Sequence, residues 1–401
     1  MKFTYLQHIP HRYLPDDLAA RYPEPVANTP YFGMAGPMLV HGDIRVALDE
    51  AMHAVRAGFD AVALTEHGRS CYDLDPNPDL GAAALAYQIG AENLNTGLHV
   101  FGRSLGKTRE PLRVAEELAW LDNLSDGRLM TGFCDANVNA GIPPIETRAR
   151  YDENLSFVLK AWTARGPFAW DGKYSQYDTV NVWPRPFQLP HPPVSVTGTG
   201  NPNTARFALH RDFGFNHVVL GGASTSADRV FDGLWRMADE LGVDDNPFRA
   251  NVGQYVLIAD TDAEAERLYT EHASHGTTRG NGHTPMHRLA LPAISFGELV
   301  DSGAIVAGSA ATVRDRLADR ARSYRVGNML LSFQTGSMST GLVKHNIDLF
   351  ASGVMPYLRG IWSEYEDTNR WWPARLGGRP VSAVQAQPAG APLTWRRHSV
   401  C

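Results

Sequence analysis

Two ionisable side chains directly follow a short apolar run near the start of the chain. Ala61–Leu64 is bounded by polar residues, which is typical of a buried parallel strand. Glu66 and His67 come just after it. Ionisable groups rarely stand at such a strand end for packing, and at the carboxyl-end mouth of a β/α barrel they would lie where catalytic groups collect. His67 beside a carboxylate could transfer protons near neutral pH.

Three further reactive groups lie at or near the ends of predicted strands. His8 follows the first strand, His99 lies within the third, and Cys134 ends the fourth. They could share one rim with His67, although a chain with 15 histidines also places some there by chance. We favour the catalytic interpretation for His67, and both interpretations stay open for the others.

A metal site is the main rival for these histidines. His8 and His11 superficially resemble the paired histidines of barrel metallohydrolases. A divalent metal needs three or four converging nitrogen or oxygen ligands. The predicted fifth strand ends at Thr197 and the eighth at Phe333, and neither end offers a histidine or aspartate. We therefore expect no metal site.

The loop after the predicted fifth strand is the best candidate for holding an anion. Glycines let the backbone approach a phosphate, and the following helix N-terminus supplies N–H groups and a positive dipole end. An ordinary glycine-rich loop remains the alternative, and no Gly-Lys-Ser/Thr follows as in a P-loop. The candidate phosphate-binding residues are Thr197, Gly198, Thr199, Gly200, Asn203 and Thr204.

Strand-like runs alternate with helical patterns along most of the chain, as in βαβ units. The predicted strands are Lys2–Gln7, Asp60–Thr65, Thr96–Phe101, Arg128–Cys134, Pro192–Thr197, Asn216–Leu220, Val252–Ala259 and Asn328–Phe333. The predicted helices are Asp43–Gly58, Asp79–Ala91, Pro111–Ser125, Thr147–Ala164, Pro202–His210, Ala310–Tyr324 and Leu342–Leu358. This pattern predicts an α/β fold, a (β/α)8 TIM-type barrel with long insertions at its carboxyl-end mouth.

The insertions and the tail define the domain organisation. His8–His41 and Ser274–Asp301 are predicted as long mouth loops, and Phe168–Trp183 as a β-hairpin outside the barrel. The tail from about Pro373 lacks periodicity and is expected to be a surface extension. We predict a barrel domain over residues 1–360 and a C-terminal extension over 361–401.

Composition excludes several classes of function. The 43% hydrophobic and 20% charged content is that of a globular protein. A net charge of -6 does not favour binding to nucleic acid or to an anionic membrane. No stretch approaches the length of a membrane span. Three cysteines, Cys71, Cys134 and Cys401, are too few for a disulfide framework, so we expect a reducing cytoplasm.

Several stretches in order resemble the bacterial luciferase-like flavin monooxygenases. The similarity spans roughly residues 40–360. Its motifs are the Glu66-His67 pair with Asn77-Pro78, the helix and turn of Glu117–Phe133, the Arg148–Trp162 helix, the Thr197–Thr204 loop with the prolines before its strand, and the closing unit that ends at Leu358.

The resemblance implies roles for particular residues. Cys134 stands where the family often has a reactive cysteine near the flavin ring, and His99-Val100 where it has a non-proline cis peptide under that ring. The Thr197–Thr204 loop would hold the flavin phosphate. Asp135 stands where the luciferases have a phosphate-binding arginine; because a carboxylate repels a dianion, either Arg206 or Arg113 substitutes or the cofactor lies differently.

The resemblance also implies a function. The chain is expected to be a monooxygenase that receives reduced FMN from a separate flavin reductase and uses O2 through a C4a-peroxyflavin. No GxGxxG fingerprint follows a predicted strand, as suits a protein that borrows reduced flavin. His67 would be the acid/base group, assisted by Glu66.

An aromatic lid (Tyr5, Tyr13, Tyr22, Tyr31, Phe32) suggests an apolar or carbonyl-bearing organic substrate. The family also implies a homodimer formed through the early helices. A deazaflavin-dependent hydride-transfer oxidoreductase and a non-catalytic flavoprotein on the same fold are the alternatives.

Overall fold

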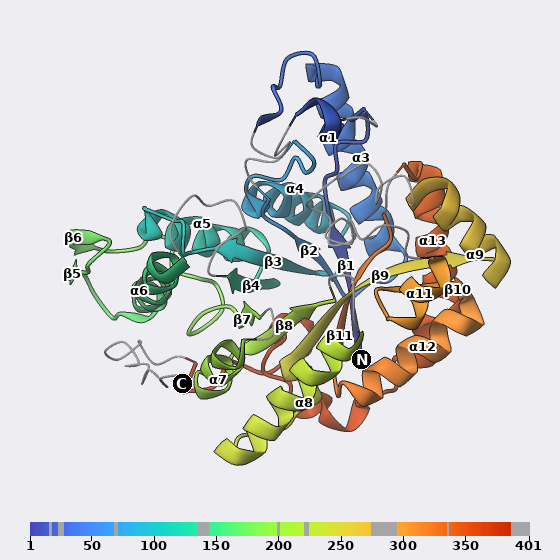
Figure 1. Cartoon of the computed structure of the whole chain (residues 1–401). Helices are drawn as coiled ribbons and strands as arrows, with labels where there is room; N and C mark the ends of the chain where they lie inside the picture. The colour runs from blue at the N-terminus through green and yellow to red at the C-terminus, as the bar shows by residue number, and fades with distance from the viewer. Residues whose placement is uncertain are drawn as a thin grey trace, which may run out of the picture.

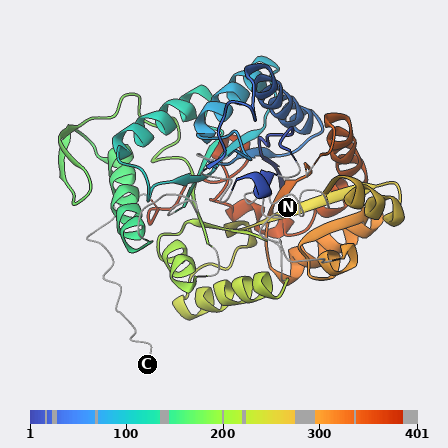
Figure 2. The ribbon, with the colours of Figure 1, turned by 45° about the horizontal axis from the view of Figure 1, so that its top comes forward.

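Eight parallel strands close into a barrel in the computed structural model, which describes residues 1–15, 18–22, 28–67, 71–134, 144–198, 201–219, 224–273, 295–334 and 337–385 (Figures 1 and 2). The neighbours run β9-β11-β1-β2-β3-β4-β7-β8, and a β8–β9 pairing closes the ring. This confirms the predicted TIM-type barrel. The barrel strands are β1 (Lys2–Gln7), β2 (Ala61–Leu64), β3 (Gly97–Ser104), β4 (Leu129–Cys134), β7 (Val194–Thr197), β8 (Gly214–Val218), β9 (Ala250–Ala259) and β11 (Asn328–Ser332).

Helices surround the barrel, and the sequence marks where several of them begin. The helices α3 to α7 each start with proline, whose fixed φ suits the first helical position. Asn77 and Asn201 cap α4 and α7 by accepting from backbone N–H groups two residues on. The α-helices are α1 (Leu18–Arg21), α3 (Pro37–Arg56), α4 (Pro78–Ala91), α5 (Pro111–Leu124), α6 (Pro144–Thr163), α7 (Pro202–His210), α8 (Ser224–Leu241), α9 (Asp262–Leu268), α11 (Phe296–Asp301), α12 (Ala310–Ser323), α13 (Thr340–Gly353) and α14 (Met355–Leu358). Shorter turns of other helix types are η1 (Pro247–Arg249), η2 (Tyr269–Ala273), η4 (Ser363–Thr368) and η5 (Ala374–Leu376).

Elements outside the barrel confirm one prediction and correct another. The strands β5 (Phe168–Asp171) and β6 (Gln176–Val180) form the predicted hairpin, which stands apart from the barrel in Figure 1. The prediction of a loop over Ser274–Asp301 is wrong for its last residues, because they form α11, whose N-cap Ser295 makes a capping box. A ninth parallel strand, β10 (Ile305–Ser309), was not predicted and pairs with the second half of β9.

The barrel interior is layered. Leu6, Ala63, Phe101 and Leu330 form an apolar layer. A buried polar chain also crosses the strands: His99 Nε2 lies 3.2 Å from Ser195 Oγ, Asn216 Nδ2 donates to the same oxygen at 2.9 Å, and Asn251 donates to Asn216. These side chains satisfy one another inside the barrel, as buried polar groups must.

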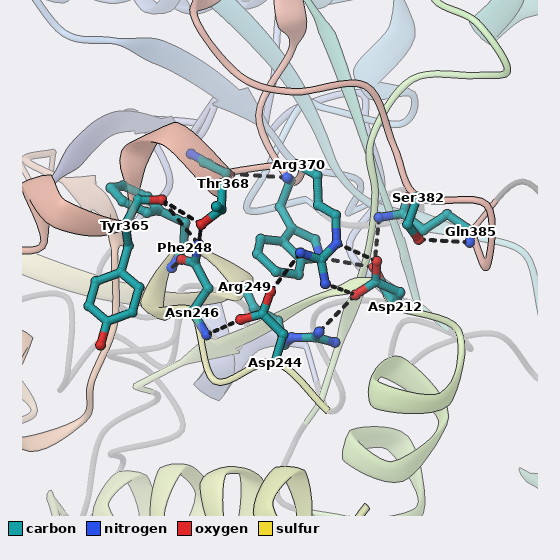
Figure 3. A network of polar contacts seen from close by, with 12 residues as sticks. Asp212, Asp244, Asn246, Phe248, Arg249, Tyr365, Thr368, Arg370, Ser382 and Gln385 are labelled. Carbon is teal, nitrogen blue, oxygen red and sulfur yellow. Dashed lines mark hydrogen bonds and ion pairs between the residues drawn. The ribbon is translucent and has the colours of Figure 1, made fainter. Parts of the chain in front are cut away.

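A C-terminal segment covers the amino-terminal end of the barrel (Figure 3). The Asp212 carboxylate, just before β8, accepts hydrogen bonds from Arg249 and Arg370, both at 2.7–2.8 Å. Trp371 donates its indole N–H to the Asp212 carbonyl at 2.9 Å and lies 4.6 Å from the Arg249 guanidinium. Trp372 is buried beside it, over a cavity of about 10 Å³ that His99 also lines.

The expected surface extension is therefore anchored at both described ends. Residues 374–384 are exposed or half-buried, but Pro373 and Gln385 are buried. Whether residues 361–401 form a unit of their own stays a prediction. Among the described residues, no helix combines the length and the apolar character needed to cross a bilayer.

Candidate active site

The carboxyl ends of β1 and β2 bring two histidines together at the barrel mouth. The rings of His8 and His67 lie 5.5 Å apart between centroids. The loop that leads into α4 then pairs with the residues after β1 through an isolated antiparallel bridge between Pro10 and Asp73. Backbone hydrogen bonds of 2.7 Å flank this bridge on both sides. The bridge carries Asp73 and Asp75 into the mouth beside the histidines.

Asp75 orients His67. Its carboxylate oxygens lie 2.9 and 3.1 Å from His67 Nδ1, its carbonyl accepts from the His67 backbone N–H at 2.9 Å, and the Thr65 hydroxyl donates to the same carboxylate. Burial alone would lower the pKa of His67, but the charges of Asp75 and Asp73 outweigh it and raise that pKa to about 9. With 20% of its side chain exposed, His67 carries a proton at neutral pH and can present Nε2 to a ligand in the mouth.

Glu66 points into a different network, so the ring of His67 is held by Asp75, although the charge of Glu66 also raises the pKa of His67. Its side chain is 1% exposed and accepts from Arg103 at 2.9 Å and from the Ser104 backbone N–H at 3.2 Å, and Lys107 pairs with it at 2.5 Å. Glu66 thus ties β2 to the end of β3. The sequence signal that was overlooked is the Asp-Leu-Asp spacing of Asp73 and Asp75, which puts both carboxylates on one side of the loop.

His8 and Asp73 complete the cluster. Burial, reinforced by the charge on His67, lowers the pKa of His8 to about 4, so its ring is neutral. That ring stacks on Tyr255, 6.3 Å between centroids. Burial raises the pKa of Asp73 to about 7 against the pull of His67. His11, by contrast, lies apart from this cluster, because its Nδ1 contacts the Asp43 carboxylate of α3 at 3.0 Å.

Cys134 lies at the same rim, whereas His99 and Val100 do not. The Cys134 thiol donates to the Gly102 carbonyl at 3.0 Å, across an irregularity in the β3–β4 pairing. His99 faces the barrel interior and Val100 packs outward into the core under the helices. The two cis peptides of the described residues precede Pro184 and Pro190, so the predicted cis bond at His99-Val100 is wrong.

The structure describes the two ends of the glycine-rich loop Thr197–Thr204. Gly198 closes β7: a Cβ there would lie 2.5 Å from the Phe215 ring, so only glycine fits. At the other end Asn203 N–H is satisfied by Asn201, and Thr204 N–H by the Asn201 carbonyl, so these two donors of α7 are already used. The Thr197 and Thr204 hydroxyls and the helix dipole remain for an anion. Thr199, Gly200 and Asp135 lie outside the described residues.

A cation that was not considered from the sequence lies between α6 and α7. The Arg148 guanidinium is 5.1 Å from the Tyr151 ring and 5.8 Å from the Phe207 ring, and it pairs with Asp152 at 3.2 Å. The two arginines considered from the sequence are less suited: Arg113 is 71% exposed and pairs with Glu117 on its own helix, and Arg206 is exposed.

Comparison with known proteins agrees with this architecture. The sequence profile of the Luciferase-like monooxygenase family matches residues 28–326. An uncharacterised protein of Sinorhizobium fredii, y4wF, is 28% identical over 305 residues, which cover 73% of this chain and 85% of that protein.

Two solved structures share the fold. One is the oxygenating constituent of 3,6-diketocamphane monooxygenase from Pseudomonas putida, a type II Baeyer-Villiger monooxygenase in complex with FMN (TM-score 0.70, 20% identity, 89% of this chain and 98% of that one). The other is an F420-dependent secondary alcohol dehydrogenase in complex with an F420-acetone adduct (TM-score 0.65, 14% identity, 89% and 99%). The chain belongs to the luciferase-like, flavin-dependent monooxygenase family.

Proposed function

We propose that this enzyme uses reduced FMN and O2 to oxygenate a small organic substrate, with His67 as its acid/base group. The observation that carries the proposal is the His67–Asp75 pair at the barrel mouth, with Nδ1 held at 2.9 Å and the ring partly open to a ligand. A carboxylate that fixes one ring nitrogen leaves the other in a defined place and protonation state, which proton transfer requires.

The described residues fit a flavin. At the β7 end, Gly198 packs against the Phe215 ring, and α7 begins just after the glycine-rich loop with an N-terminus that suits a phosphate. At the β3 end, Gly102 has a φ of +75° and open space where a side chain would be, beside the Cys134 thiol. Bound reduced flavin supplies the electrons that activate O2, while His67 supplies or removes a proton and the buried residues around it limit the access of water.

We assign Arg148 as the cation that meets the cofactor phosphate in place of the family's arginine. Its guanidinium is held against Phe207 of α7, the helix that follows the glycine-rich loop. Losing one charge-assisted contact costs about 1.5–3 kcal/mol, so Arg148→Ala should weaken reduced FMN binding roughly 10- to 150-fold. Binding of reduced riboflavin, which lacks the phosphate, should change little, and Arg113→Ala is the matched control. Equal losses for FMN and riboflavin would contradict this assignment.

The expected substrate is an apolar or carbonyl-bearing organic molecule. Tyr13, Tyr31 and Phe32 are exposed in the segment after β1 and could cover such a molecule. Tyr5 does not belong to this lid, because it is buried on β1 and stacks on Phe333 at 6.1 Å between centroids. We propose that a separate reductase delivers the reduced flavin.

A deazaflavin-dependent hydride transfer is the second candidate function. It is favoured by the structural similarity to an F420-dependent dehydrogenase and by Asp135, where the luciferases have an arginine. A non-catalytic flavoprotein is less consistent with the site, because such a protein needs no oriented His67–Asp75 pair.

We propose a homodimer formed through the early helices. Leu80 and Tyr87 of α4 and Trp120 of α5 are 68%, 72% and 52% exposed, which is unusual for large apolar side chains on neighbouring helices. Light scattering at micromolar concentration measures the state directly. Cys71 and Cys134 form no disulfide within the described residues, which suits a reducing cytoplasm, and we propose that compartment.

His67→Ala tests the assigned role. Single-turnover oxidation of bound reduced FMN should slow by roughly 10²–10⁴-fold, with reduced FMN affinity within a few-fold of the wild type. A histidine that only packs would instead lower the thermal midpoint and leave the rate per folded molecule intact. A destabilised but fully active variant would overturn the assignment.

A further inference from the structure

Three side chains with metal-ligand chemistry converge at the mouth. His8, His67 and Asp73 each offer one ligand atom, and these atoms all lie within 4.8 Å of one another. His8 and Asp73 are only 4% and 3% exposed. The backbone bridge between Pro10 and Asp73 holds the segment that carries His8 beside the loop that carries Asp73.

The ligand atoms of this cluster are available. Both carboxylate oxygens of Asp73 and the Nδ1 atom of His8 are buried without a hydrogen-bond partner in the described part of the chain. Asp75 engages His67 at Nδ1, which leaves Nε2, and an ion that binds there would displace the Nε2 proton into solvent. A buried carboxylate with no partner is costly and calls for a compensating group. Separations within 4.8 Å suit one central atom, with an inward movement to bonds of about 2.0–2.2 Å.

We propose that His8, His67 and Asp73 bind one divalent transition-metal ion of the Zn²⁺ or Co²⁺ type, with a further coordination position open to the mouth. Two imidazoles and one carboxylate are a common ligand set for such ions. Asp75 acts as the outer carboxylate that orients a metal-binding histidine. Together, Asp73 and Asp75 balance the charge of the ion in a buried place. This proposal replaces our expectation of no metal site, which rested on the missing ligands at Thr197 and Phe333, the ends of the predicted fifth and eighth strands.

The ion would also control the enzyme. Coordination occupies Nε2 of His67, so the metal-bound form lacks its acid/base group and is inactive. This consequence, unlike binding itself, rests on the function proposed above.

Titration with Co²⁺ alone tests the site in the full-length, flavin-free protein after removal of metal by a chelator. The wild type should bind about one ion per chain, seen as visible Co²⁺ absorption that Zn²⁺ displaces. Asp73→Asn and His8→Ala should abolish this signal, and Asp75→Asn should weaken binding about 10- to 100-fold. The matched control is His345→Ala on the exposed face of α13, which should bind like the wild type. Thermal midpoints on the same preparations establish that each variant is folded.

No saturable Co²⁺ signal in the wild type would leave a bridging water as the occupant and overturn the proposal. So would wild-type binding by folded Asp73→Asn and His8→Ala variants, because the ion would then lie elsewhere. The titration contains no flavin and is independent of the proposed function. If Co²⁺ binds but reduced FMN is not oxidised, the proposed function alone is overturned. If reduced FMN is oxidised but Co²⁺ does not bind, the metal site alone is overturned.

Discussion

At the scale of residues, two histidine–aspartate pairs near the amino terminus provide an internal comparison. His67 Nδ1 lies 2.9 Å from Asp75, and His11 Nδ1 lies 3.0 Å from Asp43. The first pair opens to the barrel mouth, whereas the second is buried and links the segment after β1 to α3. The two pairs thus share their local chemistry and differ in exposure, so the second pair can serve as a control for the role proposed for the first.

We expect Asp75→Asn to slow single-turnover oxidation of bound reduced FMN by at least roughly tenfold, because the His67 ring loses the group that fixes its orientation. Reduced FMN affinity should stay within a few-fold. Asp43→Asn should keep the rate and lower the thermal midpoint instead. The result that speaks against a positioning role for Asp75 is an unchanged rate, or an equal loss of rate in both variants.

Residue-level prediction from the sequence was mixed for a physical reason. His8 and His67 meet at the barrel mouth, and polar residues at the ends of apolar strands are visible in the sequence. The carboxylate that contacts the His67 ring is Asp75 and not the neighbouring Glu66, since adjacent residues in an extended segment point in opposite directions. Asp73 and Asp75 reach the mouth only through the backbone bridge to Pro10, a long-range contact that no local pattern encodes.

At the scale of elements, one buried carboxylate joins α5 to the segment that precedes β7. Asp122, near the end of α5, is fully buried and accepts from the Gln188 backbone N–H and side-chain amide, both at 2.8 Å. Gln188 also donates to the Leu129 carbonyl of β4. Burial raises the pKa of Asp122 from 3.8 to about 6, despite the hydrogen bonds that lower it.

This shift predicts a pH dependence of stability. The raised pKa means that the contribution of Asp122 is fully present below about pH 3.8 and is lost as pH rises through about 6. The free energy of unfolding of the wild type, relative to Asp122→Asn, should therefore fall by on the order of 1 kcal/mol between pH 5 and pH 7. Urea unfolding at both values measures it, with the exposed Asp178→Asn as control. A difference that does not vary with pH would contradict the shift.

Most barrel elements were predictable, and the exceptions are α8, α9, β10 and α11. Strands of a parallel barrel are continuous apolar runs, and prolines mark the first turns of α3 to α7, so both signals are local. Of the exceptions, β10 and α11 follow a long segment without periodicity. The strand β10 is defined by its pairing with the second half of β9, which is a property of the tertiary fold.

At the scale of the whole molecule, the C-terminal segment closes the barrel floor. Figure 3 shows Arg370 reaching both Asp212 and Asp244, at 2.8 and 2.7 Å for its two terminal nitrogens. Trp371 and Trp372 are 5% and 4% exposed. Losing a buried tryptophan side chain typically costs about 3–5 kcal/mol, so we expect this segment to contribute to the stability of the barrel.

Truncation after Gly360 should therefore lower the urea midpoint strongly or prevent folding, since it removes both tryptophans and leaves the Asp212 and Arg249 charges partly uncovered. Truncation after Gln385 keeps every contact described for this segment and serves as the control. If the shorter chain unfolded at the same urea concentration as the control, the segment would have no role in stability.

The most direct test of the central claim is the choice of cofactor and its reaction with oxygen. Under anaerobic conditions the full chain is titrated with reduced FMN and, separately, with reduced F420, and each complex is then mixed with O2. The account predicts saturable binding of reduced FMN and an oxidation rate that differs from that of free reduced FMN. Saturable binding of reduced F420 together with no binding of reduced FMN would contradict it.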